Sequence, residues 1–140
     1  MIFVDTSFWV ALRNQRHAHH DVATQLLAGN AGTQLTTTNH VSGETWTYLR
    51  RRAGHRAAVG FLDVIEQSPR VRVARVSEEA EQRAVTWLRQ HDEREYSFVD
   101  ATSFVVMNAL RIRDALAFDG DFSAAGFNEL RPLPRGTPVG

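Results

Sequence analysis

Acidic side chains directly follow two apolar, β-prone segments that lie far apart in the chain. Asp5 comes after the run MIFV, and Asp119 comes after the run ALAF. If both runs are parallel strands of one sheet, their carboxyl ends meet at the edge where open α/β sheets bind ligands. We therefore expect Asp5 and Asp119 to lie close together. Carboxylates gathered at such an edge suit a hard divalent cation, which prefers oxygen ligands.

Two further acidic residues interrupt segments with helical periodicity. Glu44 lies three residues after Val41 and four before Tyr48, so it shares a predicted helix face with both. Asp100 lies next to Val99 within an otherwise apolar helical segment. A carboxylate on a packing face is costly unless something compensates its charge. Bound Mg²⁺ or Mn²⁺ would supply that compensation, so both residues join the candidate metal ligands.

Each acid also has an ordinary structural interpretation. Asp5 could cap the helix that follows it, Asp100 could close a capping box, and Glu44 could pair with an arginine of its own helix. Asp119 and Asp121, separated by one glycine, could simply form a turn. The sequence leaves these interpretations open. The metal interpretation is favoured because all the positions project to one edge of the predicted sheet.

Strand-like and helix-like segments alternate along the chain, and together they predict the fold class. Predicted strands cover residues 1–4, 34–37, 71–76, 115–118 and 129–133. Helices are predicted between them, with Asn39 and Ser77 as the N-caps of two. The alternation predicts an α/β protein with a mostly parallel central sheet of four or five strands and helices on both faces. We expect one domain over residues 1–133 and a loose tail over 134–140.

Composition narrows the possible classes of protein. A length of 140 residues, with 43% hydrophobic and 23% charged residues, is typical of a single globular domain. The absence of cysteine excludes disulfides and thiolate metal sites. Every basic residue other than histidine is arginine, so mechanisms that need a lysine are excluded. No apolar run approaches the ~20 residues that span a bilayer, so we expect no membrane association. The absence of cysteine is compatible with a reducing cytoplasm, and we expect a cytoplasmic protein.

Four segments together resemble the PIN-domain family, and specifically the VapC-type toxin ribonucleases of bacterial toxin–antitoxin pairs. They are IFVDTSFWVAL with Asp5, HVSGETWTYLRRR with Glu44, YSFVDATSFVVM with Asp100, and ALAFDGDF with Asp119 and Asp121. They follow the family's order at about its spacing, and the resemblance covers nearly the whole chain. It implies a PIN-like, Rossmann-like, three-layer α/β/α fold.

The resemblance also implies an endoribonuclease that depends on Mg²⁺ and also accepts Mn²⁺. It assigns metal ligation most directly to Asp5 and Asp100, and it makes Glu44 and Asp119 direct or water-mediated partners. Asp121 matches a more variable position of the family, so its role stays open. The implied partners are an RNA substrate, a small cognate antitoxin that inhibits the enzyme, and a second copy of the chain in a homodimer.

Several other side chains have two interpretations each. Thr6 resembles the hydroxyl that supports the first acid of the family's site. Thr102 and Ser103 could support the acids, or they could bond only to the backbone of their own helix. Trp9 and Trp46 could stack on RNA bases, or they could belong to the core or to a dimer interface.

A run of arginines lies after Glu44. These residues could bind RNA phosphates, meet an acidic antitoxin segment, or form an ordinary solvated helix face. They are Arg50, Arg51, Arg52 and Arg56.

Rival classes of protein can be weighed against the same residues. Phosphohydrolases that use an aspartate nucleophile commonly carry a second aspartate two positions on, where this chain has Ser7, and they usually need a lysine. Phospho-accepting receiver domains also need a lysine. The remaining alternative is a PIN-like scaffold that binds RNA or protein without cutting. The presence of Asp5, Glu44, Asp100 and Asp119 together argues against it.

Overall fold

The computed structural model describes residues 1–134 and shows a five-stranded parallel sheet. Residues 135–140, most of the predicted tail, lie outside the described part. The strands occur in the spatial order β3-β2-β1-β4-β5. They are β1 (Ile2–Val4), β2 (Leu35–Thr38), β3 (Val71–Ala74), β4 (Asp114–Leu116) and β5 (Asn128–Glu129). The predicted parallel α/β fold is therefore confirmed.

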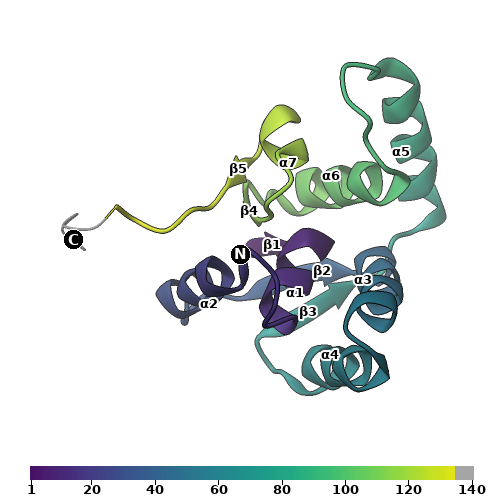
Figure 1. Cartoon of the computed structure of the whole chain (residues 1–140). Coiled ribbons are helices and arrows are strands. Elements are labelled where there is room, and N and C mark those ends of the chain that lie inside the picture. Colours follow the sequence, from purple (N-terminus) through teal and green to yellow (C-terminus); the bar gives the residue numbers. More distant parts are fainter. Residues whose placement is uncertain (135–140) are drawn as a thin grey trace.

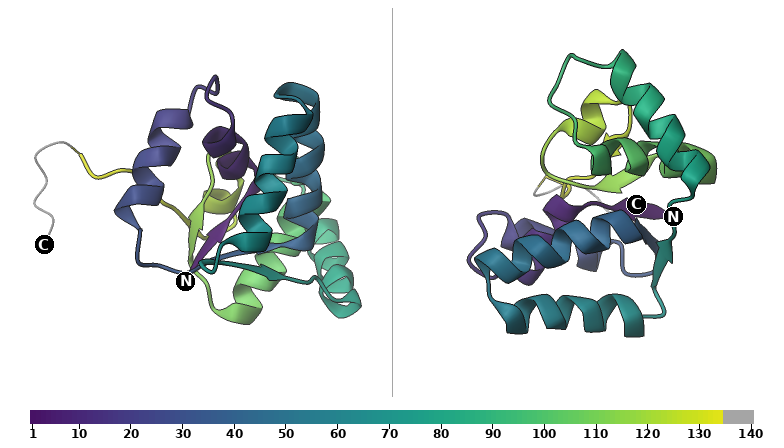
Figure 2. Two further views of the ribbon diagram at one scale, coloured as in Figure 1. Left: turned by 90° about the horizontal axis from the view of Figure 1, so that it is seen from below. Right: turned by 90° about the vertical axis from the view of Figure 1, so that its right-hand side faces the viewer.

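Helices cover both faces of the sheet (Figures 1 and 2). Helices α1 to α4 lie on one face, and α5 to α7 lie on the other, as the right-hand view of Figure 2 shows. They are α1 (Thr6–Arg13), α2 (His20–Gly29), α3 (Asn39–Arg52), α4 (His55–Gln67), α5 (Glu78–Gln90), α6 (Phe98–Leu110) and α7 (Asp121–Ala124). Within residues 1–134, no helix has the length and apolar character that crossing a membrane requires.

The strand order places a topological switch point between β1 and β4. The chain leaves β1 towards β2 and β3 on one side, and it returns through α5 and α6 to add β4 on the other side. The two strands pair in register from Ile2 with Asp114 to Val4 with Leu116. The backbone N–H of Asp5 then donates to the Leu116 carbonyl at 3.1 Å. Open parallel sheets bind ligands in the crevice beyond such a switch point.

The start of α3 differs from the prediction. Thr38, and not Asn39, is the N-cap, because the Thr38 hydroxyl accepts a hydrogen bond from the Val41 N–H at 3.0 Å. The side-chain oxygen of Asn39 instead accepts from the Val76 N–H at 2.8 Å and so joins α3 to the segment after β3. The predicted cap at Ser77 is confirmed, since its hydroxyl accepts from the Ala80 N–H.

Helix α7 was not predicted, because the Asp-Gly-Asp sequence is typical of a turn. Gly120 adopts a left-handed conformation with φ of 82°, and the chain then continues as a short helix. The Glu129 carboxylate accepts hydrogen bonds from the N–H groups of Gly120 at 3.2 Å and Ser123 at 2.8 Å. These bonds satisfy donors at the helix start that would otherwise have no partner.

Trp9 belongs to the core, so its predicted alternative role in stacking on RNA is wrong. Its side chain is 1% exposed and packs edge-on against Phe61 at a centroid distance of 5.4 Å. Its indole N–H donates to the Thr37 hydroxyl at 3.4 Å. Trp46 is partly buried against the same core.

Arg111 ends α6 in a strained backbone conformation, with φ of 58°. Its side chain is exposed and forms no hydrogen bond or ion pair within residues 1–134. We expect Arg111→Gly to raise the free energy of unfolding by about 0.5–1 kcal/mol. Glycine relieves a strain of about 1–2 kcal/mol, and the greater entropy of the unfolded chain offsets part of that gain. Urea unfolding measures the change. Arg111→Ala keeps the strain and serves as the control; a glycine variant less stable than the alanine variant would contradict the prediction.

Candidate metal centre

An open hollow of about 410 Å³ lies at the carboxyl ends of β1 and β4. Six acidic side chains line it, including all five that the sequence predicted. The lining residues are Asp5, Thr6, Ser7, Glu44, Tyr48, Glu95, Ser97, Asp100, Asp119 and Asp121. We call this hollow the acidic hollow.

Asp5 follows β1 directly and is the N-cap of α1, so its predicted capping role is confirmed. Its Oδ2 accepts hydrogen bonds from the Ser7 N–H at 3.2 Å and from the Ser7 hydroxyl at 2.7 Å. The side chain is only 2% exposed. Burial raises the pKa of Asp5 to about 8, and the negative charge of Asp119 adds to the rise. The fold therefore holds the Asp5 carboxyl group beside other acids, at a free-energy cost to its charged form.

Asp100 lies in the first turn of α6 and closes the capping box that the sequence allowed. The Ser97 hydroxyl accepts from the Asp100 N–H at 2.9 Å, and Asp100 Oδ2 accepts from the Ser97 N–H at 3.0 Å. Burial raises the pKa of Asp100 to about 7; the hydrogen bonds from Ser97 oppose this rise, and the charge of Asp119 adds to it. Asp100 thus caps its helix and lines the acidic hollow at once.

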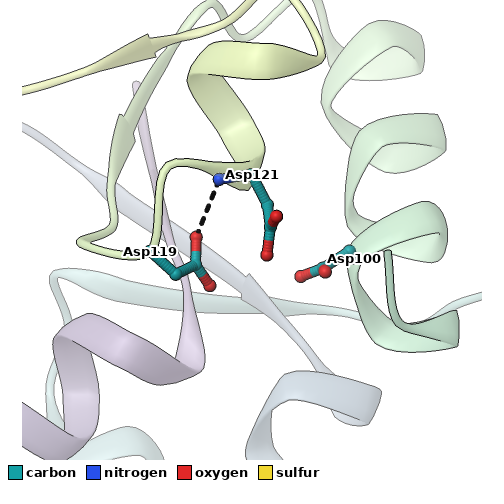
Figure 3. Close-up of side chains that lie close together, drawn as sticks. All are labelled: Asp100, Asp119 and Asp121. Atoms are coloured by element: carbon teal, nitrogen blue, oxygen red, sulfur yellow. Dashed lines mark hydrogen bonds between the residues drawn. The ribbon is translucent and has the colours of Figure 1, made fainter. Parts of the chain in front are cut away.

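Three carboxylates form the tightest group in the described chain. Asp100, Asp119 and Asp121 each offer an oxygen atom within 4.8 Å of the others. Figure 3 shows Asp100, on α6, facing the two other side chains across a gap. Asp119 Oδ1 also accepts from the Asp121 N–H at 3.1 Å. Asp5 is not part of this group, although we had expected Asp5 and Asp100 to form the principal pair.

Burial raises the pKa of Asp119, and the neighbouring Asp121 contributes to the rise. An arginine compensates part of this charge. Arg94 Nε donates to Asp121 Oδ1 at 2.9 Å, and its Nη2 donates to the Asp119 carbonyl at 3.3 Å. Sequence reasoning missed Arg94, because it lies in a charged loop that carries no motif. Its proximity arises only from the fold.

Ser7, and not Thr6, supplies the hydroxyl that supports the first acid. Besides donating to Asp5, the Ser7 hydroxyl accepts from the Phe118 N–H at 3.0 Å, so it connects the segments after β1 and β4. Thr6 Oγ1 is buried without a hydrogen-bond partner in the described structure, although Thr6 lines the hollow.

Glu44 lines the acidic hollow but does not lie on a packing face, as the helix pattern had suggested. The buried face of α3 consists of Val41, Thr45 and Leu49, and Glu44 lies one position away from it, exposed to solvent. The predicted cost of burying Glu44 is therefore absent. Its predicted pairing with an arginine is also absent from the ion pairs among residues 1–134.

Thr102 and Ser103 do not support the acids. Both hydroxyls donate to the Val99 carbonyl, at 2.9 and 2.8 Å, so they satisfy the backbone of α6. This is the simpler of their two predicted interpretations.

The side chains of the acidic hollow fit Mg²⁺ or Mn²⁺. The acids offer carboxylate oxygens only, with neither histidine nor cysteine in the group, and hard cations select oxygen donors. Burial is the main cause of the raised pKa values of Asp5 and Asp100, and the charges of neighbouring carboxylates add to both. The unpartnered Thr6 hydroxyl adds a further oxygen at the same place.

Comparison with known proteins agrees with this geometry. The family model for the PIN domain matches residues 2–128. The chain belongs to the PIN-domain family. A relative from two strains of Mycobacterium tuberculosis, named 23S rRNA-specific endonuclease VapC20, is 58% identical over 132 residues, which cover 94% of this chain and 99% of the relative.

The crystal structure of Mycobacterium tuberculosis VapC20, described as a sarcin–ricin-loop-cleaving toxin, superposes on this PIN domain with a TM-score of 0.90. The two are 57% identical, and the match covers 94% of this chain and 100% of that one. The predicted resemblance to VapC-type PIN domains is thereby confirmed.

The Ser7 hydroxyl generates a first prediction for the site. We expect Ser7→Ala to lower the free energy of unfolding by about 1–3 kcal/mol, because it leaves the Phe118 N–H unpaired and removes a hydrogen bond to Asp5. Urea unfolding without metal measures this change. Ser42→Ala is a matched control, because that hydroxyl donates only to a carbonyl of its own helix. Equal effects of the two substitutions would contradict the proposed bridging role.

The raised pKa values generate a second prediction. In the folded, metal-free protein Asp5 and Asp100 titrate near about 8 and about 7, above their usual 3.8. The folded state therefore binds protons more tightly, and its stability falls as the pH rises from about 4 to about 8. We expect the melting temperature in EDTA to fall over this range, and Mg²⁺ to stabilise the protein more at the upper end, because it binds deprotonated carboxylates.

Asp100→Asn is the matched variant for this measurement. The amide oxygen can still accept the Ser97 N–H, so the capping box stays possible while one negative charge is lost. At about pH 8 the metal-free variant should melt higher than the unmodified protein and should respond less to Mg²⁺. A metal response that is the same in both proteins at every pH would refute the metal centre.

Proposed function

We propose that this PIN-domain protein is the toxin of a type II toxin–antitoxin system and hydrolyses RNA phosphodiester bonds in the acidic hollow. The observation that carries the proposal is the convergence of six acidic side chains, from both halves of the chain, on one open hollow. The carboxylates of such a site repel an anionic substrate unless cations neutralise their charge. With a divalent cation present, it becomes a place where a phosphate can bind.

The proposed ligands are the five predicted acids, and we assign them different tasks. Asp100, Asp119 and Asp121 hold Mg²⁺ or Mn²⁺, since their oxygens already lie within 4.8 Å of one another. Asp5, fixed by Ser7, is a further ligand at the inner wall. Glu44 is exposed at the opening and orients water or a second cation.

Bound there, the cation would neutralise charge at phosphorus and lower the pKa of a coordinated water. Side chains of the protein hold the proposed metal ligands in position. Ser7 and Ser97 hold Asp5 and Asp100 by hydrogen bonds, so these carboxylates are oriented before substrate arrives. Glu44, with its unburied carboxylate, would orient this water or hold a second cation at the opening. Arg94 holds Asp121 in its position.

We infer the substrate and partners from the VapC20 relatives. We propose that the target is 23S ribosomal RNA, at its sarcin–ricin loop, because the named relative is 58% identical along almost its full length. We also propose a cytoplasmic location, a homodimer, and inhibition by a cognate antitoxin. Identity at this level supports a shared target more strongly than a shared fold does.

The proposal predicts metal-dependent cleavage at a defined place. Purified protein incubated with ribosomes and Mg²⁺ or Mn²⁺ should give a discrete cut in 23S rRNA, mapped by primer extension. EDTA should abolish the cut, and Asp100→Asn should slow it by more than about 100-fold, because even outer partners of metal ligands cost ten- to 100-fold. Ser42→Ala is the folded, active control. Metal binding without any cleavage of ribosomal or total RNA would instead favour a binding scaffold.

A further inference from the structure

The acidic hollow continues into two more hollows across the surface of α3 and α1. The second hollow, of about 490 Å³, shares Glu44 and Tyr48 with the acidic hollow. The third, of about 450 Å³, shares Arg52 with the second. The second is lined by Gly43, Glu44, Thr47, Tyr48, Arg51 and Arg52, and the third by Arg13, Asn14, Gln15, Arg16, Arg52, Ala53, Gly54 and Ala57. Shared lining residues make the three hollows one continuous surface.

The two helices that carry this surface both begin at the carboxyl edge of the sheet. Asp5 caps α1 at the end of β1, and Thr38 caps α3 at the end of β2. The helices contact each other (Figure 1). Residues at and after the C-terminal end of each helix line the third hollow. From Glu44 to Arg52 the helix rises about 12 Å, at about 1.5 Å per residue. A flexible strand entering the acidic hollow therefore has a path that leads away along α3.

Charge changes sign along this path. Glu44, at the acidic end, is the one acid that lines the second and third hollows. Four arginines follow, and all four side chains are exposed and form no ion pair within residues 1–134. They are Arg51, Arg52, Arg13 and Arg16. We call these four residues the arginine track.

Tyr48 lies where the acidic hollow meets the arginine track. Its side chain is 41% exposed, so the ring is accessible to a binding partner from solvent. The Arg52 guanidinium lies 5.1 Å from the ring centroid. A cation against one exposed aromatic ring is the combination with which proteins stack an unpaired base and hold its phosphate.

We propose that an unpaired segment of the RNA substrate runs from the acidic hollow along the arginine track, with one base stacked on Tyr48. Arg51 and Arg52 bind the phosphates next to the stacked base, and Arg13 and Arg16 bind phosphates farther from the cut. This inference rests on the proposed ribonuclease function and adds to it the residues that hold the strand. It also requires unpaired RNA, because a base within a duplex cannot stack on a side chain.

The lining favours RNA over an antitoxin segment as the occupant. The four arginines along this path are exposed and form no ion pair within residues 1–134, so their charge complements the successive phosphates of a nucleic-acid strand. The geometry also separates the arginines that the sequence grouped together. Arg50 and Arg56 are exposed but line none of the three hollows. They provide controls of the same charge, with Arg50 next to the track on α3 and Arg56 on the following helix α4.

The test measures RNA binding and not cleavage. Fluorescence anisotropy follows a fluorescein-labelled, single-stranded 12-nucleotide RNA on the Asp100→Asn protein in Mg²⁺, over a series of KCl concentrations. In this background we expect the double variants Arg51→Ala/Arg52→Ala and Arg13→Ala/Arg16→Ala each to weaken binding about tenfold or more. Each should reduce the salt slope by about 1.4, because a phosphate contact to single strands contributes about 0.7.

Substitutions of Tyr48 test the stacking of a base. Tyr48→Ala should weaken binding about tenfold without changing the salt slope, whereas Tyr48→Phe should bind nearly as well as the parent, because the ring is retained. A 12-base-pair RNA duplex should not distinguish Tyr48→Ala from its parent. The control Arg50→Ala/Arg56→Ala should keep the salt slope of the parent. Melting temperatures establish that every variant is folded.

The outcomes separate this inference from the proposed function. An Arg50/Arg56 control that weakens RNA as much as the track variants would show diffuse charge attraction and overturn the arginine track. Unchanged RNA affinity and salt slope in all track variants would also overturn the arginine track. That result would indicate that the surface binds a protein partner. Binding that follows the expected pattern while the unmodified protein cuts no RNA would support the track and reject the nuclease.

Discussion

Burial of carboxylates beside one another, at the switch point between β1 and β4, is the constraint on which the rest of the site depends. The backbone bond from Asp5 to Leu116 and the Ser7 bridge to Phe118 fix the two strand ends side by side. They bring acids together that would separate in a flexible chain, and burial raises the free energy of their charged forms. The capping box at Asp100 offsets part of this cost. The acidic side chains are therefore held in place without a cation, and the proposed cation would offset the free-energy cost of their charged forms.

Opposite charges are separated along this surface instead of being mixed. The acids gather where the sheet ends, and the arginines lie along the helices that lead away from it. Among residues 1–134, Arg94 is the one arginine that pairs with a carboxylate of the acidic hollow, Asp121. Because guanidinium groups stay protonated at any physiological pH, the attraction for phosphate does not titrate. In the proposed function the acids would respond to pH and to metal, so the proposed catalysis and the proposed strand binding would vary independently.

Much of this arrangement could be predicted from the sequence, because it follows from local patterns. Contacts between distant residues could not be predicted in this way. Asp5 and Asp119 end apolar runs, and the rule for parallel sheets places such residues at one edge. Glu44 was placed at the site correctly but was assigned to the wrong helix face, because periodicity cannot fix a helix rotation to within one residue. Arg94 contacts Asp121 across 27 positions, and Ser7 contacts Phe118 across 111. Such contacts leave no local pattern in the sequence, so only the fold reveals them.

The strand order also sets when the site can exist during synthesis. Strand β1 ends at Val4, whereas its neighbour β4 begins at Asp114 and α7 begins at Asp121. A growing chain, extended at about 5–20 residues per second, therefore lacks the complete cluster until Asp121 has been added, on the order of ten seconds after Asp5. If ribosomal RNA is the target, this order protects the translating ribosome from its own nascent product.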